Sequence, residues 1–266
     1  MKPPQAFDSL ANTYDTDFTD SPIARSLRDR VHERLARYFQ SGDHVLELGC
    51  GTGEDALWLA GRGVRVMATD ASPAMLDVTR AKAAGHPLVG VEMLDLKLVA
   101  AQHAALLQEI SFDGVFSNFG PLNVLDDWRP LAAWLAERVK PGGIAAFGVM
   151  GPLCLWEMGW HGLHGDFSTA FRRLRGEAVF QPAPDVAPLT ICYPSIQRLK
   201  ADFAPHFHCV HVESLGLCLP PSDVYGVIEK RPRLLRLLTA LEDRFGRSAA
   251  LARFADHYWI EFERRR

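Results

Sequence analysis

The chain has 266 residues, of which 48% are hydrophobic and 23% charged, and its formal net charge is −3. This length and composition predict one large α/β domain, or a domain with a substantial insertion, and the near-neutral charge argues against nucleic acid as a partner. Because no long apolar span, signal peptide or lipidation motif is visible, the sequence favours a cytoplasmic protein without membrane contact.

The segment before the first expected strand, residues 1–43, is predicted to be helical. Apolar residues recur at helical spacing from Leu27 to Phe39, which predicts a helix over residues 26–39. A shorter amphipathic piece before this helix carries Tyr14. The sequence therefore predicts a helical layer ahead of the sheet.

The next stretch has the pattern of a strand, a tight loop and a helix. His44–Leu48 is a short apolar run, and Gly49, Gly51 and Gly53 follow it directly before a helical pattern. Glycines permit positive φ and let a ligand approach the bare backbone, and amides at a helix start face that ligand. The stretch therefore predicts a nucleotide-binding site.

Two nucleotides fit this pattern. The dinucleotide fingerprint G-x-G-x-x-G/A can be placed on the run from Gly51 to Ala56, with Asp70 as the ribose ligand, and it would indicate an NAD(P)-binding oxidoreductase. That register leaves Gly49 and Glu47 without a role. An alternative register, which begins at the acidic residue, uses all three glycines.

In that register, Glu47–Gly53 (Glu-Leu-Gly-Cys-Gly-Thr-Gly) resembles the first motif of the class I S-adenosylmethionine-dependent methyltransferases. The resemblance continues over residues 7–150. It implies a doubly wound, Rossmann-like α/β fold with a seven-stranded, mostly parallel sheet, an antiparallel C-terminal strand and a small lid insertion. It also implies S-adenosyl-L-methionine as the cofactor and S-adenosylhomocysteine as the product.

The second expected strand, residues 64–69, ends at Asp70, and Ser72-Pro73 then begins another helix. A carboxylate at this place can accept two hydrogen bonds from a ribose diol. One turn into the helix, Met75 is a candidate for contact with the adenine ring, with packing in the core as the open alternative.

Asp95 and Leu96 follow a third strand over residues 88–94. The resemblance implies that this carboxylate and the neighbouring backbone amide recognise the amino edge of adenine. An Asp95 that only caps a turn is the alternative. The sequence thus predicts the adenine end of the site here.

Asn118 and Phe119 follow the fourth strand, residues 112–117. In the family, this strand end lies beside the methyl group, so both residues are candidates for the floor beneath the methionine part of the donor. The metal-dependent catechol-type members carry an aspartate at this position. Asn118 departs from that pattern and argues against a metal.

An N-terminal helical segment covers the cofactor in the small-molecule branch that this chain resembles, and its Tyr-Asp pair matches Tyr14-Asp15. The resemblance names no catalytic residue, because a sulfonium donor is already activated. The cofactor-binding residues that it implies are Tyr14, Glu47, Gly49, Cys50, Gly51, Gly53, Asp70, Ala71, Met75, Asp95, Leu96, Asn118 and Phe119.

A long insertion follows the fifth strand, residues 144–150. Residues 151–194 are rich in large aromatic side chains and are predicted to form a lid over the carboxyl edge of the sheet, where ligands bind. An extra packing layer is the alternative. His161, His164 and Tyr193 are candidates for a catalytic base only because they lie in this segment.

The C-terminal region, residues 195–266, is predicted to complete the sheet that the core, residues 44–150, begins. It includes a strand-like run with His206, His208, Cys209 and His211. Alternation along a strand points these side chains to opposite faces, whereas zinc needs about four converging ligands. The sequence therefore favours no metal here.

The sequence predicts an enzyme that moves a methyl group from S-adenosylmethionine to a small-molecule acceptor by in-line displacement. The alternatives are an NAD(P)-binding oxidoreductase and a regulatory protein that binds S-adenosylmethionine without transferring methyl. The acceptor atom (oxygen, nitrogen, carbon or sulfur), the catalytic base and the oligomeric state are not identified at this level.

Overall fold

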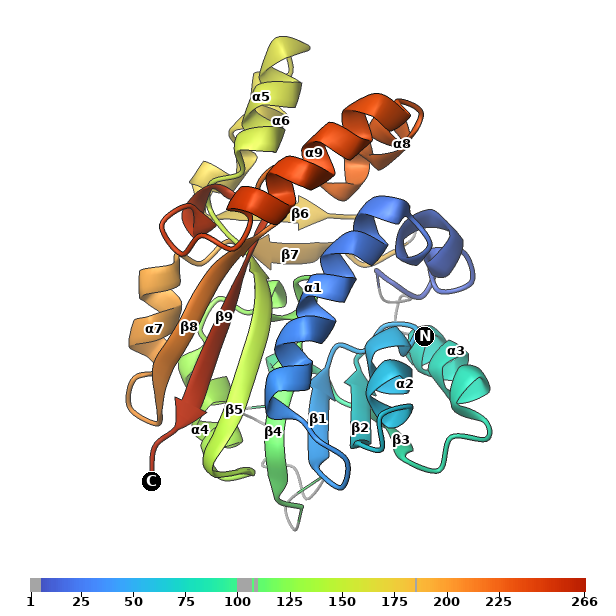
Figure 1. Ribbon diagram of the computed structural model, residues 1–266, viewed down its shortest axis with the longest axis vertical. Coiled ribbons are helices and arrows are strands. Elements are labelled where there is room, and N and C mark those ends of the chain that lie inside the picture. The colour runs from blue at the N-terminus through green and yellow to red at the C-terminus, as the bar shows by residue number, and fades with distance from the viewer. Residues whose placement is uncertain (1–5, 100–106, 108–109, 185) are drawn as a thin grey trace.

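The computed structural model describes residues 6–99, 107, 110–184 and 186–266. Its centre is a seven-stranded sheet with the order β3-β2-β1-β4-β5-β9-β8 (Figure 1). Neighbouring strands are parallel except that β9 is antiparallel to both β5 and β8. The strands are β1 His44–Leu48, β2 Arg65–Asp70, β3 Val89–Met93, β4 Phe112–Ser117, β5 Val139–Met150, β8 Phe207–Leu215 and β9 His257–Arg264. The predicted fold class is confirmed.

Helices cover both faces of the sheet. On one face lie α1 Pro22–Tyr38, α2 Glu54–Ala60 and α3 Pro73–Ala83, and on the other lie α4 Arg129–Ala136 and α7 Ile196–Phe203. Strand β5 supplies both layers: Ala145 and Phe147 pack with α4 and α7, while Ile144 and Ala146 pack with α1. This alternation explains why β5 is an almost continuous apolar run in the sequence.

The remaining helices gather at one end of the molecule. Figure 1 shows α5 Leu155–Leu163, α6 Phe167–Ala170, α8 Tyr225–Glu229 and α9 Pro232–Phe245 beyond the end of the sheet at which β5 ends. The insertion 151–194 comprises α5, α6 and an antiparallel hairpin of β6 Glu177–Phe180 and β7 Leu189–Cys192.

Two element boundaries differ from the sequence prediction by several residues. Helix α1 begins at Pro22 rather than at residue 26, because the Ser21 hydroxyl accepts hydrogen bonds from the amides of Ile23 and Ala24 and proline suits the first helical position. Strand β5 begins at Val139 and includes residues 140–143, which the sequence predicts as a turn. A register shift in its pairing with β4 accommodates them.

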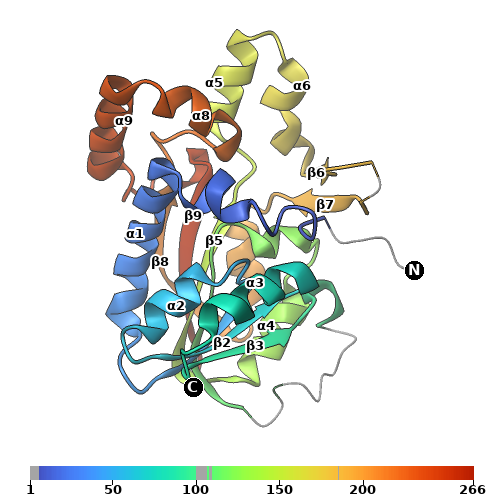
Figure 2. The ribbon, with the colours of Figure 1, turned by 90° about the vertical axis from the view of Figure 1, so that its right-hand side faces the viewer.

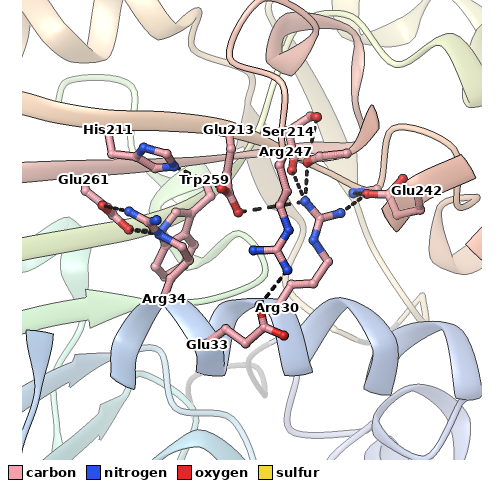
Figure 3. A network of polar contacts seen from close by, with 12 residues as sticks. Arg30, Glu33, Arg34, His211, Glu213, Ser214, Glu242, Arg247, Trp259 and Glu261 are labelled. Carbon is pink, nitrogen blue, oxygen red and sulfur yellow. Dashed lines mark hydrogen bonds and ion pairs between the residues drawn. The ribbon is translucent and has the colours of Figure 1, made fainter. Parts of the chain in front are cut away.

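A buried network of charges ties α1 to the C-terminal strands (Figure 3). Nε of Arg34 donates a 2.7 Å hydrogen bond to Glu261 on β9, and Arg30 pairs with Glu242 on α9 and with Glu213 on β8. All five side chains are at most 6% exposed. The network therefore joins α1 to β8, β9 and α9.

Two features are absent from the described residues. No helix there combines the length and apolarity that a crossing of the bilayer requires. The same part of the chain contains no group of three or more His, Cys, Asp or Glu side chains placed to hold a metal ion.

Candidate functional site

A cavity of about 360 Å³ lies at the carboxyl ends of β1, β2 and β4. This is the edge at which ligands bind in open α/β sheets. Most of the predicted cofactor-binding residues line it. They are Tyr14, Gly49, Gly51, Asp70, Ala71, Met75, Asp95, Leu96, Asn118 and Phe119.

The glycine loop shapes one wall of this cavity. Gly49 has φ +71°, and a Cβ there would lie 2.3 Å from Cβ of Pro121. Gly51 has φ +54° and no heavy atom within 4 Å of the Cβ position, so its backbone faces open space. Only glycine suits both places, and a ligand can therefore approach the loop closely.

Three predicted residues do not line the cavity. The thiol of Cys50 lies behind the loop, 3.9 Å from Oγ1 of Thr79, and burial raises its pKa. A Cβ on Gly53 would lie 2.7 Å from Cγ2 of Thr79, so this glycine lets the loop pack on α3. Glu47 is buried beneath the floor, at 2% exposure. Cys50 and Gly53 support the loop from behind.

Asp70 connects the glycine loop to the start of α3. Its carboxylate accepts hydrogen bonds from the amides of Gly51 (2.9 Å) and Ser72 (2.8 Å). Burial raises the pKa of Asp70, although these amides and that of Ala71 oppose the rise. A carboxylate offers about four acceptor positions, so Asp70 keeps capacity for two ligand hydroxyls.

Buried polar atoms at the floor of the cavity and beneath it have no hydrogen-bond partner among the described residues. They are Oε2 of Glu47, Oδ1 of Asn118 and Nε of Arg28. The amide of Asn118 donates to Asp55 at 3.0 Å, and the Arg28 guanidinium lies 5.3 Å above the Phe119 ring. Burial of unpaired polar groups is costly, so these atoms are available to a ligand that carries hydrogen-bond donors and acceptors.

Burial has a large effect on Glu47. It raises the pKa of this carboxyl well above the usual range, and the nearby Asp55 raises it further, while Arg28 lowers it. A cation placed beside Oε2 would reverse the shift. Arg28 itself was missed from the sequence, where it stands at the margin of the apolar stripe of α1.

The N-terminal segment lines the cavity with Ala6, Phe7 and Tyr14. In Figure 2 this segment runs beside the hairpin of β6 and β7. Two hydrogen bonds of 2.6 Å hold it: Oγ of Ser72 donates to Asp8, and Oγ1 of Thr52 donates to Asp15. Asp15 also forms an ion pair with Lys82 on α3. The segment is thus attached both to the glycine loop and to the following helix.

The insertion reaches the cavity through its hairpin. Pro188, Leu189 and Ile191 line the cavity, and the ring of Phe180 stacks on Phe7 with centroids 5.6 Å apart and an interplanar angle of 27°. The hairpin and the N-terminal segment therefore meet above the site. This contact joins residues that are far apart in the sequence, so spacing could not predict it.

The aromatic and histidine candidates of the insertion do not line the cavity. Trp156 donates a 2.7 Å hydrogen bond to the carbonyl of Cys218, and His161 contacts Asp223 at 3.0 Å. The other residues of this group likewise have partners elsewhere. His164 contacts the carbonyl of Trp160, Trp160 packs against the core on the α1 face, and Tyr193 lies beneath Arg173.

A second hollow of about 440 Å³ lies between the hairpin and the start of α4. It shares Leu96, Lys97 and Val124 with the first cavity. The carboxylates of Asp126 and Asp127 line it, and no residue of the glycine loop does. The smaller cavity, which the glycine loop lines, is therefore the candidate functional site.

Known proteins are similar to this chain in sequence and in fold. Residues 45–143 match the family model described as a methyltransferase domain. The chain is 32% identical over 166 residues to a malonyl-acyl-carrier protein O-methyltransferase of Serratia marcescens, an alignment that covers 60% of this chain and 58% of that protein. It is 33% identical over 138 residues to a demethylmenaquinone methyltransferase of Clavibacter sepedonicus, covering 52% and 53%.

The chain thus spans little more than half the length of these curated relatives. Among solved structures, the CcbJ methyltransferase from Streptomyces caelestis superposes with a TM-score of 0.61 over 99% of both chains. Its sequence identity is 17%, so this likeness concerns the fold alone.

Proposed function

From the premise that this chain carries a methyltransferase domain of the class I S-adenosylmethionine-dependent family, we propose that it is an enzyme that methylates a small organic acceptor by in-line displacement. Bound S-adenosylmethionine supplies a methyl group activated on a sulfonium. The names of the relatives give different acceptors, which is why the proposal names only this general class.

The observation that carries the proposal is that Asp70, which lines the cavity, keeps free acceptor positions, while unpartnered polar atoms lie at the floor of the same cavity or beneath it. Asp70 would hold the ribose diol, and Asp95 the amino edge of adenine. At the opposite end, Glu47 and Asn118 would accept from the ammonium of the methionine part, and Arg28 would hold its carboxylate. The residues present therefore fit S-adenosylmethionine.

The remaining work of the protein is alignment and exclusion of water. Tyr14 and Phe7 cover the cavity from the N-terminal segment, and Phe119 lies on its floor. We propose four functional regions on this basis. They are an N-terminal cover, residues 1–43; a donor-binding core, residues 44–150; a lid over the acceptor, residues 151–194; and a C-terminal completion of the sheet, residues 195–266.

Calorimetric titration tests this function against its alternatives. The protein should bind S-adenosylhomocysteine in the presence of a chelator and should not bind NADH; the reverse result would favour an oxidoreductase. Incubation of methyl-labelled donor with a low-molecular-weight cell extract then separates an enzyme from a regulatory binder. Donor binding without any labelled product would support the regulator.

Glu47 leads to a prediction about protons. Near neutral pH, binding of S-adenosylhomocysteine should release up to about one proton, because the ligand ammonium lowers a carboxyl pKa that burial had raised. Calorimetry in buffers of different ionisation enthalpy measures this number. Glu47→Gln should abolish the release, and an unchanged release in that variant would show that another group titrates.

The stacked pair Phe7 and Phe180 leads to a second prediction. Phe180→Ala should weaken S-adenosylhomocysteine binding about twofold to tenfold, since an aromatic pair contributes about 0.5–1.5 kcal/mol beyond area burial. Val179→Ala, at a neighbouring position that is 69% exposed, is the matched control. Equal affinities of the two variants would mean that the hairpin does not hold the cover closed.

A further inference from the structure

A buried histidine, His257, lies next to residues that line the cavity and is not among the residues proposed to hold the donor. His257 is the first residue of β9, and the sheet register pairs it with Met150, the last residue of β5. Met150 lines the cavity. The pairing therefore places His257 at the same edge of the sheet as the donor site.

Asp256 orients this imidazole. Nδ1 of His257 lies 3.0 Å from one carboxylate oxygen of Asp256, while the other oxygen accepts a 2.6 Å hydrogen bond from Arg173. Burial acts to raise the pKa of Asp256, but His257 and Arg173 hold it well below its usual range. Because the ionised carboxylate can only accept, Nδ1 carries the ring proton and Nε2 keeps a lone pair.

The lone pair on Nε2 has no partner. His257 is 9% exposed, and its Nε2 is buried without a hydrogen bond to any described residue. A Cβ built on Gly120 would lie 3.6 Å from Nε2, and the ring stands edge-on to Phe119 with centroids 6.0 Å apart. Gly120 and Phe119 both line the cavity, so Nε2 faces its wall at the end proposed for the methyl group.

We propose that His257, oriented by Asp256, is the catalytic base that removes a proton from the acceptor. This inference rests on the proposed function and adds a class of acceptor: a hydroxyl that is protonated at neutral pH, such as a phenol or an enol. Nothing else at this end of the cavity combines a free lone pair with a buried carboxylate behind it among the residues that the structure describes.

The proposed step balances as follows. The acceptor O–H gives its proton to Nε2 as its oxygen forms a bond to the methyl carbon; the carbon–sulfur bond breaks, and its electron pair stays on sulfur as a neutral thioether. His257 becomes an imidazolium, which Asp256 stabilises. Arg173 pairs with Glu157 and with Oδ1 of Asp256. Oδ2 of Asp256 therefore stays available to His257. The imidazolium then loses its proton to solvent.

The alternative is that the pair only secures the start of β9. The two roles differ in how His257 responds to charge on the donor. A base at the methyl end lies close to a sulfonium cation in S-adenosylmethionine and to a neutral sulfur in S-adenosylhomocysteine. A purely structural histidine would not distinguish the two ligands.

Nitrogen-15 NMR of histidine-labelled protein makes this comparison without any acceptor. We expect His257 to show the Nδ1–H tautomer and a titration midpoint lower by about half a pH unit or more with S-adenosylmethionine than with S-adenosylhomocysteine. The charged and titratable groups around the His257–Asp256 pair are the same in both complexes. They are Arg173, Glu157, Cys154, Tyr193 and Tyr225, together with Arg28 across the Phe119 ring. His208, exposed on β8, is the internal reference. Equal midpoints, or a proton on Nε2, would overturn the proposal.

Two acceptors of matched size provide the kinetic test. Phenol is protonated at pH 7.5 and needs a base, whereas thiophenol is largely ionised there and does not. His257→Gln should lower kcat/KM for phenol about a hundredfold or more and change that for thiophenol less than about threefold. His208→Gln, at an exposed position on β8, is the matched control. An equal loss on both acceptors, or no loss on phenol, would contradict the assignment.

Separate readouts distinguish this proposal from the function it rests on. If the wild-type protein fails to bind S-adenosylhomocysteine, the proposed function is wrong. If it binds but methylates neither probe, the NMR comparison alone decides the role of His257. That comparison uses the wild-type protein, so it still tests the role of His257 when the His257→Gln variant does not fold.

Discussion

Arg34→Met is expected to lower the free energy of unfolding by about 3–5 kcal/mol, because it leaves a buried carboxylate without its counter-charge. Glu261, at 0% exposure, accepts hydrogen bonds from Arg34, Tyr38 and Trp259. Burial alone acts to raise its pKa, but these three donors hold it below the usual value. In the variant, the remaining donors Tyr38 and Trp259 are neutral and cannot replace the positive charge of Arg34. Chemical denaturation at neutral pH measures the loss.

The pH dependence of this loss has a definite sign. A carboxyl whose pKa is lowered in the folded state stabilises it above the ordinary glutamate pKa of about 4.3, and that contribution disappears as pH falls through the folded-state value. The difference in the free energy of unfolding between wild type and Arg34→Met should therefore become smaller below about pH 4. A gap independent of pH would mean that the loss comes from packing of the arginine stem.

Two further variants test whether the loss in Arg34→Met comes from the broken ion pair. Arg25→Met removes an arginine from the same helix whose partner Asp20 is exposed, and it should cost at most about 1 kcal/mol. Adding Glu261→Leu to Arg34→Met removes the unpaired charge, so the double variant should lose less than the sum of the two single losses. A full additive loss would contradict the ion-pair explanation.

The core of the fold and most of the residues that line the cavity could be predicted because their signals are local. Glycines at 49 and 51 and the strand before them lie within one strand–loop–helix unit, and Asp70 ends the next strand. Each such unit brings its own ligand groups to the carboxyl edge of the sheet. Gly49, Gly51 and Asp70 lie within residues 45–143, which match a methyltransferase domain model.

The rest depends on contacts between distant parts of the chain. Phe7 meets Phe180 only because the hairpin folds back over the N-terminal segment, and His257 reaches the cavity only through the register of β9 on β5. Arg28 illustrates a different limit. Its guanidinium faces inward over Phe119, and the apolar stripe of α1 does not reveal which polar neighbour does so. Spacing in the sequence carries none of this information.

Asp70→Ala should weaken S-adenosylhomocysteine binding about tenfold to a hundredfold. The ribose diol would lose a charge-assisted partner worth about 1.5–3 kcal/mol. The structure adds a second reason for the loss: the same carboxylate accepts the amides of Gly51 and Ser72, which hold the loop and the start of α3 in place. Calorimetry on the folded variant measures the dissociation constant.

Two controls separate the ligand contact from the loop contact. Asp70→Asn keeps an oxygen for one backbone amide but removes the charge, so its affinity should lie between those of wild type and Asp70→Ala. Asp77→Ala removes a carboxylate that is 76% exposed on α3 and should leave affinity unchanged. If Asp70→Ala binds as tightly as wild type while its melting temperature falls, Asp70 supports only the loop. The ribose would then need another partner, and the cofactor assignment would rest on the floor of the site alone.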